Sequence, residues 1–246
     1  MKKIIEILIS KLFIQNLGTL TYLKIENIFR WFLYRAQISS IIKQYKIDVV
    51  IDVGANEGQF AKLIRKHFDG DIYSFEPVSS TFKILEANSK NDHQWHVFNF
   101  ALGSENKTQN IHLSRKSVFN SLLKTNSYCE QHFGEEAISG GEEIISIKRV
   151  DSILQNLIPN IENKRILLKM DTQGFDINVF NGLGNYLKYV YAIQTELSMI
   201  SIYEEMPHWT KNVEIFEANG FRVAGLFPVN RDKEKVIEYD CLMTRT

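Results

Sequence analysis

Short apolar segments of strand length alternate with amphipathic segments of helical length, and this alternation constrains the fold more than any other feature. The strand-like segments of the first half are VVIDV (49–53), DIYSFEP (71–77) and WHVFNFAL (95–102), and GQFAKLIRKHF (58–68) and SSTFKILEANSK (79–90) separate them. Strands that alternate with helices form βαβ units, in which the strands run parallel in one sheet. The sequence therefore predicts an α/β fold with a doubly wound, mostly parallel sheet.

The same alternation resumes in the second half of the chain. Helices are predicted at 150–157, 176–183 and 208–220, and strands at 165–171, 191–197, 221–227 and 238–245. Residues 103–148, which join the two halves, are polar. For them the sequence predicts a short strand at 110–113, a loop at 115–123 and a mobile segment around EEAISGGEE (135–143), whose charges and glycines leave little apolar area to bury.

Residues 1–46 precede the alternation and are predicted to form a helical extension of two or three helices, followed by the main domain at 47–246. An apolar stripe at helical spacing is expected to pack on that domain as a cap. Its members are Ile25, Ile28, Phe29, Phe32 and Leu33. Because basic and aromatic residues are mixed here, a lid or a peripheral contact with a membrane surface is the alternative.

Composition narrows the classes of function. The 29 lysines and arginines balance the 29 aspartates and glutamates, which argues against a nucleic-acid partner, since such proteins need a basic surplus. Cys129 and Cys241 lie far apart, so they predict free thiols rather than a disulfide or a zinc site. No apolar run reaches the roughly 18 residues of a membrane span, and we expect a cytoplasmic protein.

The loop DVGANEG (52–58) follows the first strand and opens a helix, which is where ligands bind in an open parallel sheet. Gly54 and Gly58 allow the backbone to approach a ligand closely, and the helix N-terminus offers free amide groups. The dinucleotide fingerprint GxGxxG is missing, and Asp52 and Glu57 are acidic. The loop therefore suits a cationic ligand such as S-adenosylmethionine better than a pyrophosphate.

The next two strands end in residues that could hold the rest of such a ligand. Glu76 lies 24 residues after Asp52, at the tip of the second strand, where an acid can accept hydrogen bonds from both hydroxyls of a ribose. Asn99 could meet the edge of an adenine and Phe100 its face, although Phe100 fits the core equally well.

Three further carboxylates are expected at the same rim of the sheet. Asp171 ends the fourth predicted strand, Asp176 follows it, and Glu196 ends the fifth. A helix cap for Asp176 and an ion pair for Glu196 are the structural alternatives. His132 and His208 are further candidates, but a lone histidine is more often a surface or core residue.

In combination, these segments resemble the FkbM-type methyltransferases, which are class I S-adenosylmethionine-dependent enzymes with a Rossmann-like fold. The matching motifs, from about Val49 to Arg245, are VIDVGANEGQF, SFEPVSSTF, FNFALGS, SVFNSL, VD at 150–151, LLKMDTQGFDINVFNGL and QTELS. The residues expected at the S-adenosylmethionine site are Asp52, Gly54, Ala55, Asn56, Glu57, Gly58, Phe60, Glu76, Pro77, Asn99, Phe100 and Ala101. The resemblance also implies O-methylation of a hydroxyl, often on a glycan, glycolipid or natural product. One position departs from the family pattern Asp-x-Glu-Gly-x-Glu, because Gln173 stands where the family usually has an acid.

A sugar hydroxyl is a weak nucleophile near neutral pH, so a general base or a metal ion is expected beside it. Asp171 is the first candidate for the base, Glu196 the second and Asp176 the third. A metal-assisted variant would use Asp171 and Asp176 as oxygen ligands. Two other functions stay open: a nicotinamide-dependent oxidoreductase, and a protein that binds the cofactor without turnover, in which Gln173 would mark lost chemistry.

Overall fold

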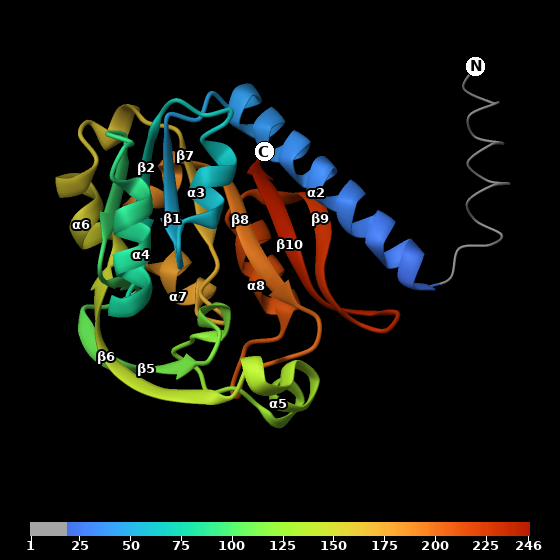
Figure 1. The fold of residues 1–246 in the computed structure, drawn as a ribbon. Helices are drawn as coiled ribbons and strands as arrows, with labels where there is room; N and C mark the ends of the chain where they lie inside the picture. The colour runs from blue at the N-terminus through green and yellow to red at the C-terminus, as the bar shows by residue number, and fades with distance from the viewer. Residues whose placement is uncertain (1–18) are drawn as a thin grey trace, which may run out of the picture.

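A computed structural model shows the fold of the protein and describes residues 19–246 (Figure 1). The helices are α2 (Thr19–Gln44), α3 (Gln59–Ile64), α4 (Ser79–Ser89), α5 (Ser127–Phe133), α6 (Val150–Leu157), α7 (Asp176–Gly182) and α8 (Trp209–Ala218). The strands are β1 (Val49–Val53), β2 (Asp71–Phe75), β3 (Trp95–Phe98), β4 (Ala101–Gly103), β5 (Lys107–Ser114), β6 (Ser139–Arg149), β7 (Ile166–Met170), β8 (Val190–Ser198), β9 (Phe221–Asp232) and β10 (Lys235–Arg245).

Seven of the strands form the central sheet, in the order β3-β2-β1-β7-β8-β10-β9. β1 pairs in parallel with β2 on one side and with β7 on the other, whereas β10 is antiparallel to both of its neighbours. The chain builds outward from β1 in one direction and from β7 in the other, so the topological switch point lies between these two strands. The predicted doubly wound, mostly parallel sheet is confirmed.

Helices cover both faces of this sheet and produce two apolar cores. One core includes residues of α2, α3 and α4, and the other includes residues of α6, α7 and α8. The side chains of β1 alternate between them: Val49, Ile51 and Val53 pack into the second core and Val50 into the first. A strand buried on both faces reads as a continuous apolar run, which is why VVIDV is recognisable in the sequence.

The predicted strand at 95–102 is divided between two sheets. The chain leaves the central sheet after Phe98, and Asn99 donates its side-chain amide to the backbone oxygens of Glu76 and Pro77, both at 3.0 Å. It then continues as β4, which belongs to a separate sheet with the order β4-β6-β5. The side chain of Asn99 thus stabilises the turn between the two sheets.

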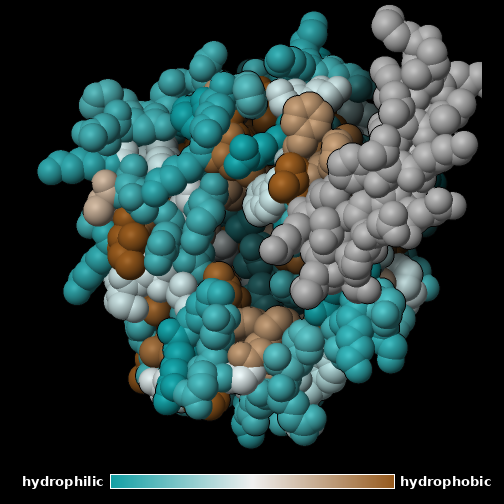
Figure 2. All heavy atoms as spheres, turned by 45° about the vertical axis from the view of Figure 1, so that its right-hand side comes forward, coloured by the Kyte–Doolittle hydropathy of each residue, from teal (hydrophilic) through white to brown (hydrophobic). Residues whose placement is uncertain are grey.

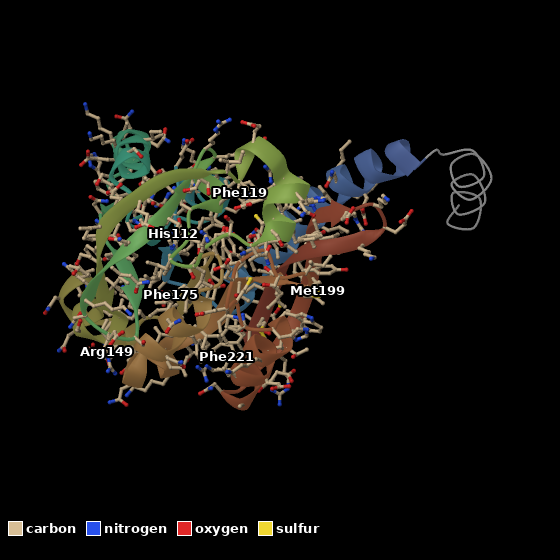
Figure 3. All side chains as sticks on the ribbon, turned by 90° about the horizontal axis from the view of Figure 1, so that it is seen from below. His112, Phe119, Arg149, Phe175, Met199 and Phe221 are labelled. Atoms are coloured by element: carbon tan, nitrogen blue, oxygen red, sulfur yellow. The ribbon has the colours of Figure 1, made fainter. Side chains whose placement is uncertain are left out.

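The prediction of a mobile segment at 135–143 is wrong from Ser139 onward. Residues 139–149 form β6, which pairs with β5 along its length, so backbone hydrogen bonds order this polar stretch. Ile111, Ile145 and Ile147 bury the inner side of the pair. Figure 1 shows β5, β6 and α5 below the carboxyl ends of the parallel strands, and Figure 3 shows the same edge from below, with Phe119 and Phe175 labelled. This second sheet therefore lies over the edge of the central sheet at which the parallel strands end.

α2 packs beside β9, but through the face opposite to the predicted stripe. Its buried residues are Arg30, Tyr34, Ile38, Ile41 and Ile42, whereas Ile28, Phe29, Phe32 and Leu33 are each more than half exposed. The stripe stops at Leu33 and is followed by Ala36, Ser39, Ser40 and Lys43, while the buried face stays apolar to the end of the helix. The structure thus describes one long helix here; the remaining helices predicted before Thr19 lie outside the described residues.

Two further predictions concern membranes and thiols. Within residues 19–246 we find no helix that combines the length and the apolar character needed to cross a bilayer. Cys129 and Cys241 are buried free thiols, as predicted.

The pairing of β5 with β6 predicts slow hydrogen exchange in the ligand-free protein. Backbone amides of residues 141–147 should be protected well beyond the rate of an unstructured peptide, because their ladder partners in β5 are fixed. Exchange measured by mass spectrometry on the apoprotein tests this. Random-coil rates in this segment would restore the original expectation of a mobile loop.

Candidate active site

A cavity of about 500 Å³ opens at the carboxyl ends of the parallel strands. Figure 2, a view from the side, shows a hollow near the centre of the molecule with hydrophilic side chains in its depth. Nine of the fifteen site residues predicted from the sequence line the cavity: Gly54, Ala55, Asn56, Phe60, Glu76, Pro77, Ala101, Asp171 and Glu196. The structure therefore brings the predicted cofactor loop and two of the predicted acids into one enclosed space.

The glycine at position 54 is required by close backbone packing. Its φ is +70°, and a Cβ there would strike the backbone carbonyl of Asp171 at the end of β7. The amides of Gly54 and Ala55 both donate to the carbonyl of Phe75 at 3.0 Å, which fixes the loop against β2. The loop therefore reaches the cavity wall in one defined conformation. A glycine is required at position 58 for a different reason, because a Cβ atom there would clash with the Trp95 ring.

Glu76 is held as a hydrogen-bond acceptor at the cavity wall. Only 6% of its surface is exposed, and its two carboxyl oxygens accept from the backbone amides of Asn56 and Val78, both at 2.9 Å. Burial raises the pKa of this carboxyl to about 7, although the two amides oppose the shift. Each carboxyl oxygen keeps a second acceptor position for a ligand hydroxyl.

Asp52 lies beneath the loop and outside the cavity lining, where it binds Lys169. The Lys169 ammonium is 2.9 Å from the Asp52 carboxylate and donates to the carbonyl of Gly54 at 2.7 Å. Burial alone would lower the pKa of Lys169, but Asp52 and Asp171 outweigh it and raise this pKa to about 12. Sequence reasoning missed Lys169, although a lysine inside the apolar run ILLKM is a signal for a buried partner.

Gln173 joins the two predicted catalytic acids that line the cavity. Its side-chain amide donates to Asp171 and to Glu196, each at 2.9 Å, and its carbonyl oxygen accepts from the Tyr203 hydroxyl at 2.8 Å. Burial raises the pKa of Glu196 well above its usual value, and the carboxylates of Glu238 and Asp171 raise it further. One neutral side chain thus separates two carboxyl groups that would otherwise repel each other.

Asp176 does not line the cavity. It begins α7, is buried, and accepts hydrogen bonds from the backbone amide and hydroxyl of Thr172 and from the hydroxyl of Thr195. Burial raises its pKa against the effect of these hydrogen bonds. Asp176 therefore does not cap α7, whose N-cap position is Phe175 without a side-chain cap bond; its contacts instead order the turn between β7 and α7.

The remaining predicted residues also support the cavity from outside its lining. Phe100 packs on Phe75 and Phe98 in the core, and the Lys148 ammonium lies 4.0 Å from its ring centre. The backbone carbonyl of Glu57 accepts from Asn88. Neither His132, which stacks on Tyr128, nor His208, which contacts Thr210, belongs to the cavity lining.

Several lining residues escaped the sequence analysis because they come from distant segments. The loop after β5 lies over the cavity, and the Ser117 hydroxyl donates to the side chain of Asn56 at 3.1 Å. α2 contributes Arg30, Trp31 and Tyr34, and β8 and β10 contribute Gln194, Glu238 and Asp240. The sequence of β8 and β10 did contain a sign of these residues, because polar side chains alternate with apolar ones along both strands. Within residues 19–246 no three acidic, histidine or cysteine side chains are arranged to hold a metal ion.

Comparison with known proteins gives one strong match. The Methyltransferase FkbM domain matches residues 52–223, more than two thirds of the chain. No curated protein sequence matches. Among solved structures, precorrin-6y C5,15-methyltransferase from Geobacter metallireducens GS-15 has a TM-score of 0.44 and 12% identity, with 86% of this chain and 87% of that chain covered. Magnesium protoporphyrin IX methyltransferase from Synechocystis PCC 6803, solved with bound S-adenosylmethionine, has a TM-score of 0.43 and 8% identity, with 87% and 80% covered.

Replacing Gln173 by glutamate should destabilise the protein by about 1–3 kcal/mol near pH 8, because an amide donor is lost and a third carboxylate meets Asp171 and Glu196. The new carboxyl group would have a raised pKa in the folded state. The variant should therefore be nearly as stable as the wild type at low pH, where the new carboxyl group is protonated, and it should lose stability as the pH rises and this group ionises. Urea unfolding at pH 5.5 and pH 8 measures the difference. Gln131→Glu, on the exposed side of α5, is the matched control, and equal behaviour of the two variants would contradict the role of Gln173.

Proposed function

The chain belongs to the FkbM methyltransferase family, and from this premise we propose that it transfers a methyl group from S-adenosylmethionine to a hydroxyl of a sugar in a glycan, glycolipid or related metabolite. The observation that carries the proposal is the pair of carboxyl groups, Asp171 and Glu196, which Gln173 holds together in the cavity wall. Asp171 follows β7 and contacts Gly54 of the loop after β1. A candidate base therefore lies next to the candidate cofactor loop.

The residues present fit an adenosyl cofactor. Gly54, Ala55 and Asn56 form a wall of backbone and small side chains that can approach a ligand closely, and Glu76 offers free acceptor positions at the tip of β2. These residues would hold the methionine part and the ribose, respectively. Bound S-adenosylmethionine supplies a methyl group on a positively charged sulfonium.

The chain's own residues would then orient the acceptor and remove its proton. Asp171 would accept the hydroxyl proton, and the Gln173 amide keeps the Asp171 carboxylate directed into the cavity. Tyr203 and Ser121, which bond to the side-chain carbonyl and the backbone carbonyl of Gln173, hold that amide in position. The loop 116–122 and α2 shield the cavity, so fewer waters compete with the acceptor.

The contacts of Gln173 favour turnover over cofactor binding alone. Its side-chain amide makes three hydrogen bonds and links both acids to Tyr203, so the two candidate bases keep fixed positions in the cavity wall. The oxidoreductase alternative has no comparable support, since the loop 52–58 lacks the glycine pattern that a dinucleotide requires.

Methyl transfer can be tested directly with radiolabelled S-adenosylmethionine and a panel of glycans and glycolipids. We expect label in at least one hydroxyl-bearing acceptor and no oxidation of NADH in the presence of the same acceptors. Glycosyltransferase genes next to the gene for this chain would direct the panel toward surface polysaccharides. Reduction or oxidation of an acceptor without label transfer would contradict the proposal.

Cofactor affinity should depend on pH through Glu76. Because its pKa is raised to about 7, the ionised form that accepts two ribose hydroxyls best becomes dominant only above neutrality. We expect the affinity for S-adenosylmethionine to rise about tenfold between pH 6 and pH 8. Isothermal titration calorimetry measures this, and Glu76→Gln should bind more weakly with little pH dependence. A wild-type profile that matches the Glu76→Gln profile would remove Glu76 from the site.

Replacing Asp171 by asparagine should separate catalysis from cofactor binding. The asparagine carbonyl can still accept from Gln173, so the geometry persists while the base is lost. We expect kcat to fall by about 10²-fold or more with nearly unchanged affinity for S-adenosylmethionine. Asp69→Asn, exposed and outside the cavity, controls for the change of charge. Near-normal turnover of Asp171→Asn would leave Glu196 as the next candidate.

A further inference from the structure

One wall of the cavity carries three carboxyl groups that the methyl-transfer scheme does not all use. Glu196 lies on β8, Glu238 and Asp240 lie on β10, and all three line the cavity with Gln194 and Arg30. We call these five residues the carboxylate wall. Residues 194 and 196 share one face of β8, and 238 and 240 share the same face of the neighbouring strand, so the wall is a continuous patch of the sheet.

This cluster of carboxyl groups should lower the stability of the folded protein. Glu196 and Asp240 are direct partners across β8 and β10, where like charges are destabilising. The Arg30 guanidinium lies 3.9 Å from Asp240. Burial, with a smaller contribution from the Asp171 carboxylate, raises the pKa of both Glu238 and Asp240 to about 7. A sheet face that only packed against α2 would be apolar, so a ligand is the better explanation for these groups.

The wall has more acceptor capacity than the protein fills. Glu196 receives one hydrogen bond from Gln173, Asp240 one from Gln194, and Glu238 one each from Asn230 and Ser198. A carboxyl group can accept more hydrogen bonds than these in either protonation state, and its protonated form also donates one. The unfilled positions call for a ligand that both donates and accepts hydrogen bonds.

Two unpartnered groups give independent evidence that a ligand binds here. Gln194 is 3% exposed and Arg30 is 8% exposed, yet the Gln194 side-chain oxygen and the Arg30 Nε make no hydrogen bond within residues 19–246. The first is an acceptor and the second is a donor. Each such buried group costs free energy until a partner arrives, and both line the cavity.

We propose that the carboxylate wall is the acceptor subsite and binds an uncharged, hydroxyl-rich sugar unit, while it excludes sugars that carry a carboxylate or a phosphate. A hydroxyl both donates and accepts, so it can satisfy the carboxyl groups, Gln194 and Arg30 together, whereas an ammonium group can only donate. An anion would add acceptors beside three carboxyl groups. This inference rests on the proposed methyl transfer and specifies its acceptor.

The carboxylate wall includes a residue of α2, so this helix forms part of the proposed subsite. Arg30 on α2 and Glu238 and Asp240 on β10 lie outside the segment 52–223 that the family domain matches, whereas the candidate cofactor loop lies within it. The acceptor end of the cavity thus combines Gln194 and Glu196, from the matched segment, with elements that flank it. Specificity for the sugar would then depend in part on α2 and β10.

Ligand binding can be measured without turnover. The full chain, saturated with S-adenosylhomocysteine, would be titrated with neutral mono- and disaccharides and with their uronic-acid and phosphorylated counterparts, using saturation-transfer difference NMR. We expect at least one neutral sugar to bind, with about tenfold or greater preference over its anionic counterpart. Glu238→Gln should weaken that binding by about tenfold or more, because one charged acceptor is lost.

Stability provides the readout that separates a binding role from a structural one. If Glu238 is retained for the ligand, Glu238→Gln should have a Tm at or above that of the wild type while its sugar affinity falls. Asp240→Asn should behave similarly, and Glu234→Gln, in the exposed turn between β9 and β10, should leave both quantities unchanged. A lower Tm with unchanged sugar binding would overturn the proposal.

Two further outcomes distinguish this proposal from the proposed function. Failure of every neutral sugar to bind, or tighter binding of the anionic members, would overturn the acceptor subsite even if methyl transfer to another acceptor is observed. Conversely, a neutral sugar that binds at the wall but is never methylated would overturn the proposed function and support the subsite.

Discussion

The buried ion pair of Lys169 and Asp52 organises the whole ligand-binding edge. It joins β7 to β1 across the switch point, and the same ammonium group holds the carbonyl of Gly54. Asp52 is fixed in turn by Ser74 on β2, whose hydroxyl also accepts from the Trp95 indole at the start of β3. Four adjacent strands are thus connected by one chain of polar contacts. Removing either charge would break this buried ion pair, which is destabilising, although Lys169 would keep a contact with Asp171 at 3.7 Å and Asp52 its hydrogen bond from Ser74.

Much of the fold could be predicted from local patterns. Strands buried on both faces are continuous apolar runs, and the helices between them have a clear period, so β1, β2 and β7 are evident from the sequence. The β5–β6 pair was not evident, because backbone pairing rather than apolar burial orders most of it. The wrong face of α2 was predicted to be buried, since the exposed residues of its first half are strongly apolar and only its second half distinguishes the two faces.

The sequence predicted those residues of the candidate site that directly follow a parallel strand. Gly54, Glu76 and Asp171 each lie at or just after the carboxyl end of a parallel strand, and the topology rule places such residues together. The carboxylate wall could not be found in this way, because it depends on β10 lying between β8 and β9, which no local pattern shows. Gln173 was treated as a departure from a motif, and only the three-dimensional contacts reveal that it bridges two acids.

The position of β10 has a consequence for the order in which the protein can assemble during synthesis. β9 leaves the ribosome before β10, yet within the described sheet it pairs only with β10, so it cannot join until the later strand has emerged. Until then β8 presents an open edge, with Gln194 and Glu196 facing no partner strand. The loop 52–58, β2 and β7 precede β8, so the candidate cofactor end can form while the proposed acceptor subsite is still missing. A nascent chain would thus complete the two ends of the cavity one after the other, separated by the synthesis of a single hairpin.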